Sequence, residues 1–251
     1  MAGEAATLDR LATAVGGSVI GDATVAVTDV THDSRAAGPG ILFAAIRGFT
    51  VDGHDFVAQA VSAGSPAVCV EDGGRSAGVP AIVVSDTRAA LGPLAATVHG
   101  DPSADLRLVG VTGTNGKTTV THLIEAMAGA AGLRTAVIGT VGARIGDRSV
   151  PVARTTPEAS DFQRLLATMV EGAVDVAAVE VSSHALALGR VAATRFRVGA
   201  FTNLSPDHLD FHADMEAYFA TKAALFEQAE QAVVWVDDPA GARLAGSLRI
   251  P

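Results

Sequence analysis

The stretch of residues 109–119, with the sequence VGVTGTNGKTT, constrains the fold of this chain more than any other. An apolar run at 106–111 predicts a buried strand, and Lys117 opens an amphipathic segment that predicts a helix to about Gly129. A glycine-bracketed turn joins the two. Backbone N–H groups of such a turn can close on an anion, and the helix N-terminus adds partial positive charge. The stretch therefore predicts an α/β fold with a phosphate-binding loop.

The residue types in this loop fit phosphate chemistry. Lys117 supplies a mobile ammonium, and Thr118 can offer its hydroxyl to a phosphate-bound Mg²⁺. The standard spacing would place glycine at Val111, so the match is a shorter form, Gly-x-x-Gly-Lys-Thr. A purely structural βα turn would explain the two glycines but not the Lys-Thr-Thr that follows. The predicted phosphate-binding residues are Gly113, Thr114, Asn115, Gly116, Lys117, Thr118 and Thr119.

Composition excludes several classes of protein. The net charge of −9 argues against a nucleic-acid surface and against adhesion to an anionic membrane. No run approaches the roughly 18 apolar residues of a membrane span, and the start, MAGEAATLDR, lacks the apolar region of a signal peptide. Cys69 is the single cysteine and lies in an apolar run, which predicts an inert core thiol and a cytoplasmic setting.

Alternating strand and helix patterns predict two α/β units, residues 1–100 and 101–251, divided near 100–103. In the first, the patterns predict helices within 1–20 (ending at Gly16-Gly17), 55–63 and 86–99, with Asp86 as N-cap, and strands at 24–30, 41–46, 66–70 and 81–84. In the second, they predict strands at 106–111, 135–140, 174–181, 196–202 and 232–236, helices at 117–129, 158–171 and 214–228, and an irregular segment at 141–157. This second sheet looks incomplete after Val236.

Polar clusters fall just after predicted strand ends, where open α/β sheets bind ligands. Glu180 ends an apolar strand, a costly place for an unpartnered carboxylate, and is predicted to bind a metal opposite the phosphate loop. A capping or salt-bridged acid is the alternative. Ser182, Ser183 and His184 form either a cap or the rim of a site. Residues 207–212, DHLDFH, have the types of a metal site, or form a solvated loop before a helix. Without cysteine support for zinc, Mg²⁺ is the expected metal.

The chain uses arginine almost everywhere and has only two lysines, Lys117 and Lys222. Phe219, Leu225 and Phe226 flank Lys222 at helical spacing, so a partly desolvated amine with a lowered pKa is one interpretation. Such an amine can take up CO₂ and become a Mg²⁺-binding carbamate. A surface lysine with its stem on apolar neighbours is the other interpretation.

Several motifs in register, from about Val27 to the end, resemble the Mur ligases and within them the MurE type. The motifs are VTGTNGKTT (111–119), TTPE (155–158), EVSSHAL (180–186), GRV (189–191), FTNLSPDHLDFH (201–212), YFATKAALF (218–226), DSR (33–35), PGILF (39–43) and DGH (52–54). The resemblance implies a uridine-binding domain followed by an ATP-binding domain of the P-loop type. It also implies a monomer without nucleic-acid or membrane partners.

The activity that the resemblance implies is an ATP-dependent amide-bond ligase. ATP would phosphorylate the D-Glu γ-carboxylate of UDP-MurNAc-L-Ala-D-Glu, and meso-diaminopimelate or L-lysine would attack the acyl phosphate. The Ala-, Gly- and Arg-rich composition is typical of a GC-rich bacterial genome, in which diaminopimelate is the expected choice. Lys117 would neutralise the β/γ-phosphates, Thr118 and Glu180 would hold one Mg²⁺, and His208 with a carbamate on Lys222 would hold a second. Such an arrangement of cations would screen the two anions that must meet.

The implied substrate contacts lie in both units. The contacts to uridine are Ser34 and the backbone around Phe49, Thr50 and Val51, and the contacts to peptide and sugar are Thr155, Thr156, Ser182 and Arg190. Two departures weaken this set, because Leu188 stands where the family often has glutamine and Phe49-Thr50 replaces a more polar pair.

The family carries a further C-terminal domain that binds the incoming amino acid, and nothing in these 251 residues corresponds to it. The chain is therefore expected to be a truncated form that binds nucleotide substrates with little turnover alone. MurF-like, MurC-like and folylpolyglutamate synthetase-like ligases share the loop, but TTPE with EVSSHAL favours the MurE type. A non-catalytic UDP-sugar-binding module is the alternative from another class. Intact Lys117, Glu180, His208 and Lys222 argue against it, and the missing domain argues for it.

Overall fold

A computed structural model describes residues 5–251 of the chain. These residues form two compact units. One contains the described residues up to Pro102 together with Ala159–Ala167, and the other contains Ser103–Glu158 together with Thr168–Pro251. No helix in the described part of the chain is long and apolar enough to cross a bilayer.

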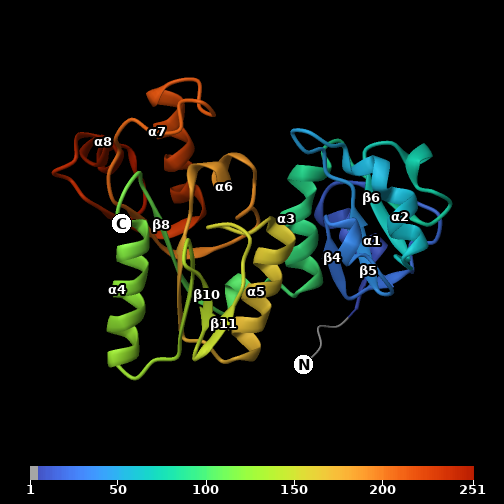
Figure 1. The fold of residues 1–251 in the computed structure, drawn as a ribbon, viewed down its shortest axis with the longest axis horizontal. Helices are drawn as coiled ribbons and strands as arrows, with labels where there is room; N and C mark the ends of the chain where they lie inside the picture. The colour runs from blue at the N-terminus through green and yellow to red at the C-terminus, as the bar shows by residue number, and fades with distance from the viewer. Residues whose placement is uncertain (1–4) are drawn as a thin grey trace. The chain divides into compact units, whose positions relative to one another are not determined.

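The first unit is built on a five-stranded sheet (Figure 1). The order is β2 (Ser18–Ile20), β7 (Ala81–Val83), β6 (Ala67–Val70), β5 (Ile41–Ala44) and β4 (Asp29–Thr31), with β4 to β7 parallel and β2 antiparallel at the edge. The helices are α1 (Leu8–Ala14), α2 (Val57–Ser62) and α3 (Thr87–Val98), with 3₁₀ turns at Ser34–Ala36, Gly53–Phe56 and Gly73–Arg75 and a small pair of strands, β1 (Ala6–Thr7) and β3 (Ala26–Val27).

Side chains alternate across this sheet and build a core on each face. In β5, Leu42 and Ala44 join a cluster with α1 and α3, whereas Phe43 joins a cluster on the other face with Val57 and Ala60 of α2. This period of two is what a strand covered on both faces requires. Cys69 of β6 is fully buried, and burial raises the pKa of its thiol to about 12, in agreement with the predicted core thiol.

The second unit contains a seven-stranded sheet (Figure 1). The order is β11 (Arg148–Val150), β10 (Gly142–Ile145), β9 (Thr135–Gly139), β12 (Val176–Glu180), β8 (Arg107–Thr112), β13 (Phe196–Phe201) and β14 (Ala229–Val234). The five strands from β9 to β14 are parallel, and β10 and β11 form an antiparallel hairpin. The helices are α4 (Lys117–Ala130), α5 (Ala159–Glu171, shared with the first unit), α6 (Ser183–Ala187), α7 (Met215–Ala223) and α8 (Pro239–Ser247), with 3₁₀ turns at Pro102–Ala104 and Ala224–Gln228. An α/β fold is thus confirmed, with mostly parallel sheets.

Several predicted elements differ from the structure. The strand expected at 24–30 is divided between β3 (Ala26–Val27), which pairs with β1, and β4 (Asp29–Thr31) of the five-stranded sheet. The segment 141–157, expected to be irregular, contains the β10–β11 hairpin; its strands lie at the sheet edge and are too short to show a periodic pattern. The helix expected to reach residue 228 changes to 3₁₀ geometry after Ala223. The last strand begins and ends earlier than predicted, and α8 follows it unpredicted. Of the helix expected within 1–20, residues 1–4 lie outside the described part, and residues 18–20 form β2.

Candidate functional site

The loop after β8 has a backbone that favours glycine at two positions. Gly113 and Gly116 both have positive φ, at +137° and +84°, and Gly116 caps α4. A Cβ on Gly113 would lie 1.9 Å from the Thr202 hydroxyl. The loop therefore opens directly into the N-terminus of α4, the arrangement that suits a phosphate group.

The segment after β13 is bonded to this loop. Thr114 donates its N–H to the Asn203 carbonyl (2.9 Å), and Asn115 donates its N–H to the Asn203 side-chain oxygen (3.0 Å). Thr202 in turn donates its hydroxyl to the Asn115 carbonyl (2.7 Å), and Ser205 donates its N–H to the Thr114 hydroxyl (3.0 Å). The segment that carries the predicted His208 ligand is thereby held against the predicted phosphate loop.

The two lysines of the chain meet at one carbonyl oxygen. The Lys117 ammonium donates to the carbonyls of Gly113 (2.9 Å) and Thr114 (2.8 Å), and Lys222 donates to the same Gly113 carbonyl (2.9 Å). Lys222 is only 1% exposed and its amine lies 4.5 Å from the centre of the Tyr218 ring. The structure therefore favours the buried-amine interpretation of Lys222 over the surface one.

Burial and the neighbouring Lys117 ammonium lower the pKa of Lys222 to about 7, and the Asp207 carboxylate partly opposes this. Burial also lowers the pKa of Lys117, against the attraction of Glu180 and Asp207. A substantial fraction of the Lys222 amine is thus neutral near neutral pH. A neutral amine is the form that reacts with electrophiles such as CO₂.

Glu180 ends β12, between β8 and β9, and is 1% exposed. Three neutral donors surround its carboxylate: the Thr118 hydroxyl (3.0 Å), the Thr140 N–H (2.9 Å) and the Thr140 hydroxyl (3.2 Å). The buried carboxylate is therefore solvated by hydroxyl and amide groups and does not cap a helix. Thr118 and Glu180, from different elements, present two hard oxygen atoms together, as a Mg²⁺ site requires.

His208 lies in a group of rings with His184, Phe211, His212 and Tyr218. Its ring centroid is 4.8 Å from that of His184 and 6.3 Å from that of Tyr218, and its φ is +54°. Burial lowers the pKa values of His184 and His212, so both are neutral at neutral pH. A neutral imidazole can ligate a metal.

The described residues contain no group of three or more His, Cys, Asp and Glu side chains placed to hold a metal ion. Of the predicted ligands only Glu180 and His208 are of these types; the others are the Thr118 hydroxyl and a modified lysine. The donor set would suit Mg²⁺, which keeps several waters and phosphate oxygens among its ligands.

The four predicted peptide and sugar contacts lie near Glu180 with different exposures. Thr156 is buried and donates its hydroxyl to the Glu180 carbonyl (2.8 Å). Ser182 caps α6 by accepting the N–H of Ala185 (3.1 Å), which is the capping role that its position also allowed. Thr155 is half-buried, and its hydroxyl lies 3.1 Å from that of Thr140.

Arg190 is buried in an ion pair. Its guanidinium donates to the Glu158 carboxylate (3.0 Å) and to the Thr156 carbonyl (3.4 Å). In this conformation Arg190 holds the segment 156–158 in place. A direct contact from Arg190 to a ligand would require its guanidinium to move away from Glu158.

The predicted uridine contacts lie in the first unit. Ser34 begins a 3₁₀ turn capped by Asp33, and its hydroxyl donates to Gln59 (3.3 Å). Residues 48–51 form a tight turn in which Gly48 donates to the Val51 carbonyl (2.9 Å). Phe49 at the tip is 80% exposed.

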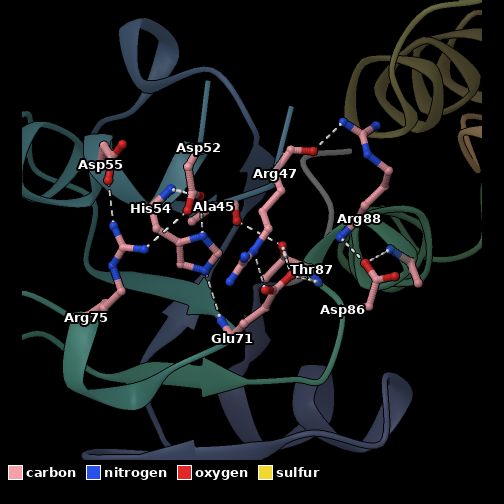
Figure 2. A network of polar contacts seen from close by, with 11 residues as sticks. Ala45, Arg47, Asp52, His54, Asp55, Glu71, Arg75, Asp86, Thr87 and Arg88 are labelled. Atoms are coloured by element: carbon pink, nitrogen blue, oxygen red, sulfur yellow. Dashed lines mark hydrogen bonds and ion pairs between the residues drawn. The ribbon is translucent and has the colours of Figure 1, made fainter. Parts of the chain in front are cut away.

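A polar network anchors the base of this turn (Figure 2). The His54 ring lies between Asp52 and Glu71: its Nδ1 is 2.7 Å from the Asp52 carboxylate, and its Nε2 accepts the N–H of Glu71 (3.0 Å). This assigns the proton to Nδ1. Glu71 also pairs with Arg47 (2.7 Å), and the His54 N–H and ring hold the pKa of Asp52 at about 2. The turn thus has a rigid base and an exposed apolar tip.

Sequence reasoning missed Thr140, Asn203 and Tyr218. Thr140 and Asn203 each follow a strand end, but a single hydroxyl or amide is common there and carries no charge that demands a partner. The Tyr218 hydroxyl lies 3.3 Å from that of Thr114, a pairing of residues 104 positions apart that no local pattern contains.

Two family models match the chain. "Mur ligase middle domain" matches residues 111–249, and "Mur ligase family, catalytic domain" matches residues 26–99. Two relatives, both named UDP-N-acetylmuramoyl-L-alanyl-D-glutamate–2,6-diaminopimelate ligase, come from Streptomyces coelicolor and Chlorobaculum tepidum. The first is 48% identical over 92% of this chain and 46% of its own length, and the second is 44% identical over 97% and 50%.

Solved structures agree with these matches. The structure of a ligase of the same name superposes with a TM-score of 0.81 at 27% identity, over 97% of this chain and 50% of that one. MurF from Acinetobacter baumannii shares the fold, with a TM-score of 0.70 at 21% identity, over 98% and 52% of the two chains. The chain spans about half the length of the curated relatives it matches.

Proposed function

We propose that this chain, which belongs to the Mur ligase family, is the nucleotide-binding part of a ligase that joins 2,6-diaminopimelate to UDP-MurNAc-L-Ala-D-Glu. The relatives at 44–48% identity carry that activity in their names. In this proposal the first unit takes the uridine end of the substrate and the second takes ATP. The reaction belongs to peptidoglycan precursor synthesis, in a cytoplasmic monomer.

The observation that carries the proposal is the convergence of Lys117, Lys222, Thr118 and Glu180 on one loop. The reaction must bring a carboxylate to the γ-phosphorus of ATP, so two anions have to approach each other. The carboxylate oxygen attacks that phosphorus, ADP leaves, and the amine then displaces phosphate from the acyl phosphate. Cations fixed in a partly dry site stabilise both displacements.

We assign each residue a role on this basis. Lys117 would neutralise the β/γ-phosphates, and residues 113–119 would surround them. The N–H groups of Thr114 and Asn115 already donate to Asn203, so the other N–H groups of this stretch would contact the phosphates. Thr118 and Glu180 would hold one Mg²⁺, and His208 with a carbamylated Lys222 would hold another; the metal ions would offset phosphate charge. Carbamylation needs the neutral amine, whose nitrogen attacks CO₂ and loses a proton to solvent. The lowered pKa of Lys222 supports that step. Thr155, Thr156, Ser182 and Arg190 would line the peptide side, and Ser34 with Phe49, Thr50 and Val51 the uridine.

Calorimetry on this chain tests the proposal. Mg·ATP and UDP-MurNAc-L-Ala-D-Glu should each bind, and Lys117→Ala should weaken Mg·ATP binding at least tenfold while leaving the UDP-sugar affinity within about twofold. Binding of the UDP-sugar without any Mg·ATP binding would instead favour the non-catalytic module. Phosphate release that needs UDP-MurNAc-tripeptide in place of the dipeptide would point to another Mur ligase type.

The carbamate has its own test. In an assay of phosphate release dependent on the dipeptide substrate and diaminopimelate, Lys222→Ala should abolish any turnover that the wild-type chain has, and a small carboxylate such as acetate should restore part of it. Undiminished activity in Lys222→Ala would remove this residue from the mechanism.

A further inference from the structure

We propose that Thr140 is a positioning residue that fixes the Glu180 carboxylate and couples it to Thr155, so that the nucleotide and the UDP-sugar substrate bind cooperatively. The coupling rests on the proposed function, whereas the positioning of Glu180 rests on the contacts alone.

Thr140 holds both oxygens of the carboxylate. It follows β9, which pairs with β12 up to Ile138 and Val179, so its backbone lies beside Glu180. Its N–H donates to Oε1 (2.9 Å) and its hydroxyl to Oε2 (3.2 Å). Thr118 contributes a single bond, to Oε2 (3.0 Å), and its hydroxyl oxygen is the atom proposed to bind Mg²⁺. Thr140 therefore supplies the two bonds that a metal at Thr118 would leave undisturbed.

The preceding residue, Gly139, also lies directly against the carboxylate. A Cβ on Gly139 would lie 2.1 Å from Glu180 Oε1 and 2.8 Å from its carboxyl carbon. The carboxylate thus rests directly on the backbone of β9. It has little room to adopt a second position while the Thr140 bonds persist.

The number of hydroxyl protons determines which threonine is the donor in each of these hydrogen bonds. Each threonine hydroxyl has one proton to donate. Because the Thr140 proton points to Glu180, the 3.1 Å contact between the hydroxyls of Thr140 and Thr155 must use the proton of Thr155. The chain of donors therefore runs from Thr155 to Thr140 to Glu180, from a half-buried hydroxyl to a buried carboxylate.

A ligand at Thr155 and a metal-bound nucleotide at Glu180 would order the same three side chains. The ligand that binds first bears the loss of side-chain freedom, and the second finds the groups already placed. This gives positive coupling, which must be reciprocal. Its expected size is about fivefold in affinity, at the low end of measured couplings.

Calorimetry on the full 251-residue chain with a non-hydrolysable Mg·ATP analogue tests this inference. Thr140→Val keeps the shape and the backbone bond but removes the hydroxyl, and should weaken analogue binding about tenfold, as expected for a hydrogen bond to a charged group. Thr140→Ser should restore affinity to within about twofold. Thr13→Val is the matched control, because that hydroxyl bonds only within α1, to the Asp9 carbonyl.

The coupling is measured by repeating each titration with saturating UDP-MurNAc-L-Ala-D-Glu. We expect the fivefold gain in the wild type and in Thr13→Val, and no gain in Thr140→Val. Thr155→Val provides a second variant, which should lose the fivefold gain when it is titrated at a UDP-sugar concentration that saturates the variant itself. Mn²⁺ bound with the analogue, followed by electron paramagnetic resonance, should show an altered metal environment in Thr140→Val alone.

The outcomes separate the two proposals. Unchanged affinity in Thr140→Val would overturn the positioning role, and unchanged coupling in both valine variants would overturn the connection through Thr155. A wild type that binds the analogue but not the UDP-sugar would overturn the proposed substrate and the coupling, while the tenfold loss in Thr140→Val would still support positioning of Glu180. A wild type that binds neither ligand would overturn both proposals.

Discussion

Lys222 shows at the scale of one residue how burial prepares a side chain for chemistry. Its ammonium has a ring, a second lysine and one carbonyl oxygen as its nearest partners, and its pKa of about 7 follows from burial first and from Lys117 second. A lysine on the surface would be almost fully protonated near neutral pH. Burial of Lys222 therefore lowers the free energy of unfolding at neutral pH and raises the fraction of its amine in the neutral, reactive form.

This exchange predicts how stability depends on pH. The folded state binds fewer protons at Lys222 than the unfolded state between pH 7 and about 10.5, so the free energy of unfolding should rise with pH in that window. The contribution is about 1 kcal/mol per pH unit, and it levels off as the pH falls through the folded-state pKa of about 7 and both states become protonated. Urea unfolding in CO₂-free buffers from pH 8 to 9.5 measures it.

Lys222→Met should flatten that slope by the same amount, because the titrating amine is gone. The exposed Arg10→Met is the control and should keep the slope. Lys117 remains in both variants and adds a smaller slope of the same sign, since its pKa is also lowered. Equal slopes in wild type and Lys222→Met would contradict the buried-amine assignment.

Gly139 predicts a second effect at this scale. Gly139→Ala would drive a methyl group into the Glu180 carboxylate and should weaken Mg·ATP binding at least tenfold, with a loss of about 1–3 kcal/mol in stability from overpacking. Gly129→Ala in α4 is the control: its Cβ meets nothing within 4 Å, so it should raise stability by about 0.5–1 kcal/mol and leave binding unchanged. Equal binding by both variants would argue against a fixed carboxylate.

Charge decided which site residues could be predicted from the sequence. Glu180 and Lys222 could be identified because burying an ionisable group in an apolar segment costs free energy unless a partner or a function compensates for it. Thr140 and Asn203 did not stand out, since threonine and asparagine cost little at a strand end. That Lys117 and Lys222 share the Gly113 carbonyl depends on two segments 105 residues apart meeting in space, which no local pattern encodes.

At the scale of elements, caps were predictable and edges were not. Asp86 was predicted to cap α3, and its carboxylate accepts the N–H groups of Arg88 (2.8 Å) and Ala89 (3.0 Å). The β10–β11 hairpin was not predicted, because edge strands of three or four residues bury few side chains. A helix cap depends on one residue and its neighbours in the sequence, whereas an edge strand forms only where it can pair with the rest of the sheet.

The cap gives a prediction for α3. Asp86→Ala should lower the free energy of unfolding by about 1 kcal/mol, because two backbone N–H groups lose their acceptor. Asp86→Ser should retain most of the stability, since a serine hydroxyl can accept the same bonds. Denaturant unfolding followed by circular dichroism measures both, and an alanine variant as stable as the serine variant would contradict a capping role.

At the scale of the whole molecule, the net charge of the chain has the same sign as the charge of the nucleotides it is proposed to bind. The chain carries a net charge of −9, yet its two proposed nucleotide ligands, ATP and the UDP-sugar, are anions. Binding must therefore rely on local cations and on Mg²⁺. The order of the second sheet, with β12, β8 and β13 adjacent, explains how loops far apart in sequence supply one site. The sequence indicated that polar clusters follow strand ends, but strand order depends on long-range pairing that it could not reveal.

Removal of the metal should thus weaken nucleotide binding strongly. In excess EDTA the affinity for ATP should fall at least tenfold, because Thr118 and Glu180 would no longer present a cation to the phosphates and the net charge repels them. Readdition of Mg²⁺ should restore it. An ATP affinity that is indifferent to EDTA would contradict the proposed magnesium site.

The pairing of both lysines on one loop has a practical consequence for labelling. Reagents that acylate lysine side chains find no fully exposed lysine on this chain, because its only two lysines are Lys117, which is half-buried, and Lys222, which is 1% exposed. Lysine acylation is therefore a footprint of the site itself. Mass spectrometry of the two tryptic sites, with and without nucleotide, would read occupancy directly, and lysine-directed coupling to a solid support would block the loop that the experiment sets out to study.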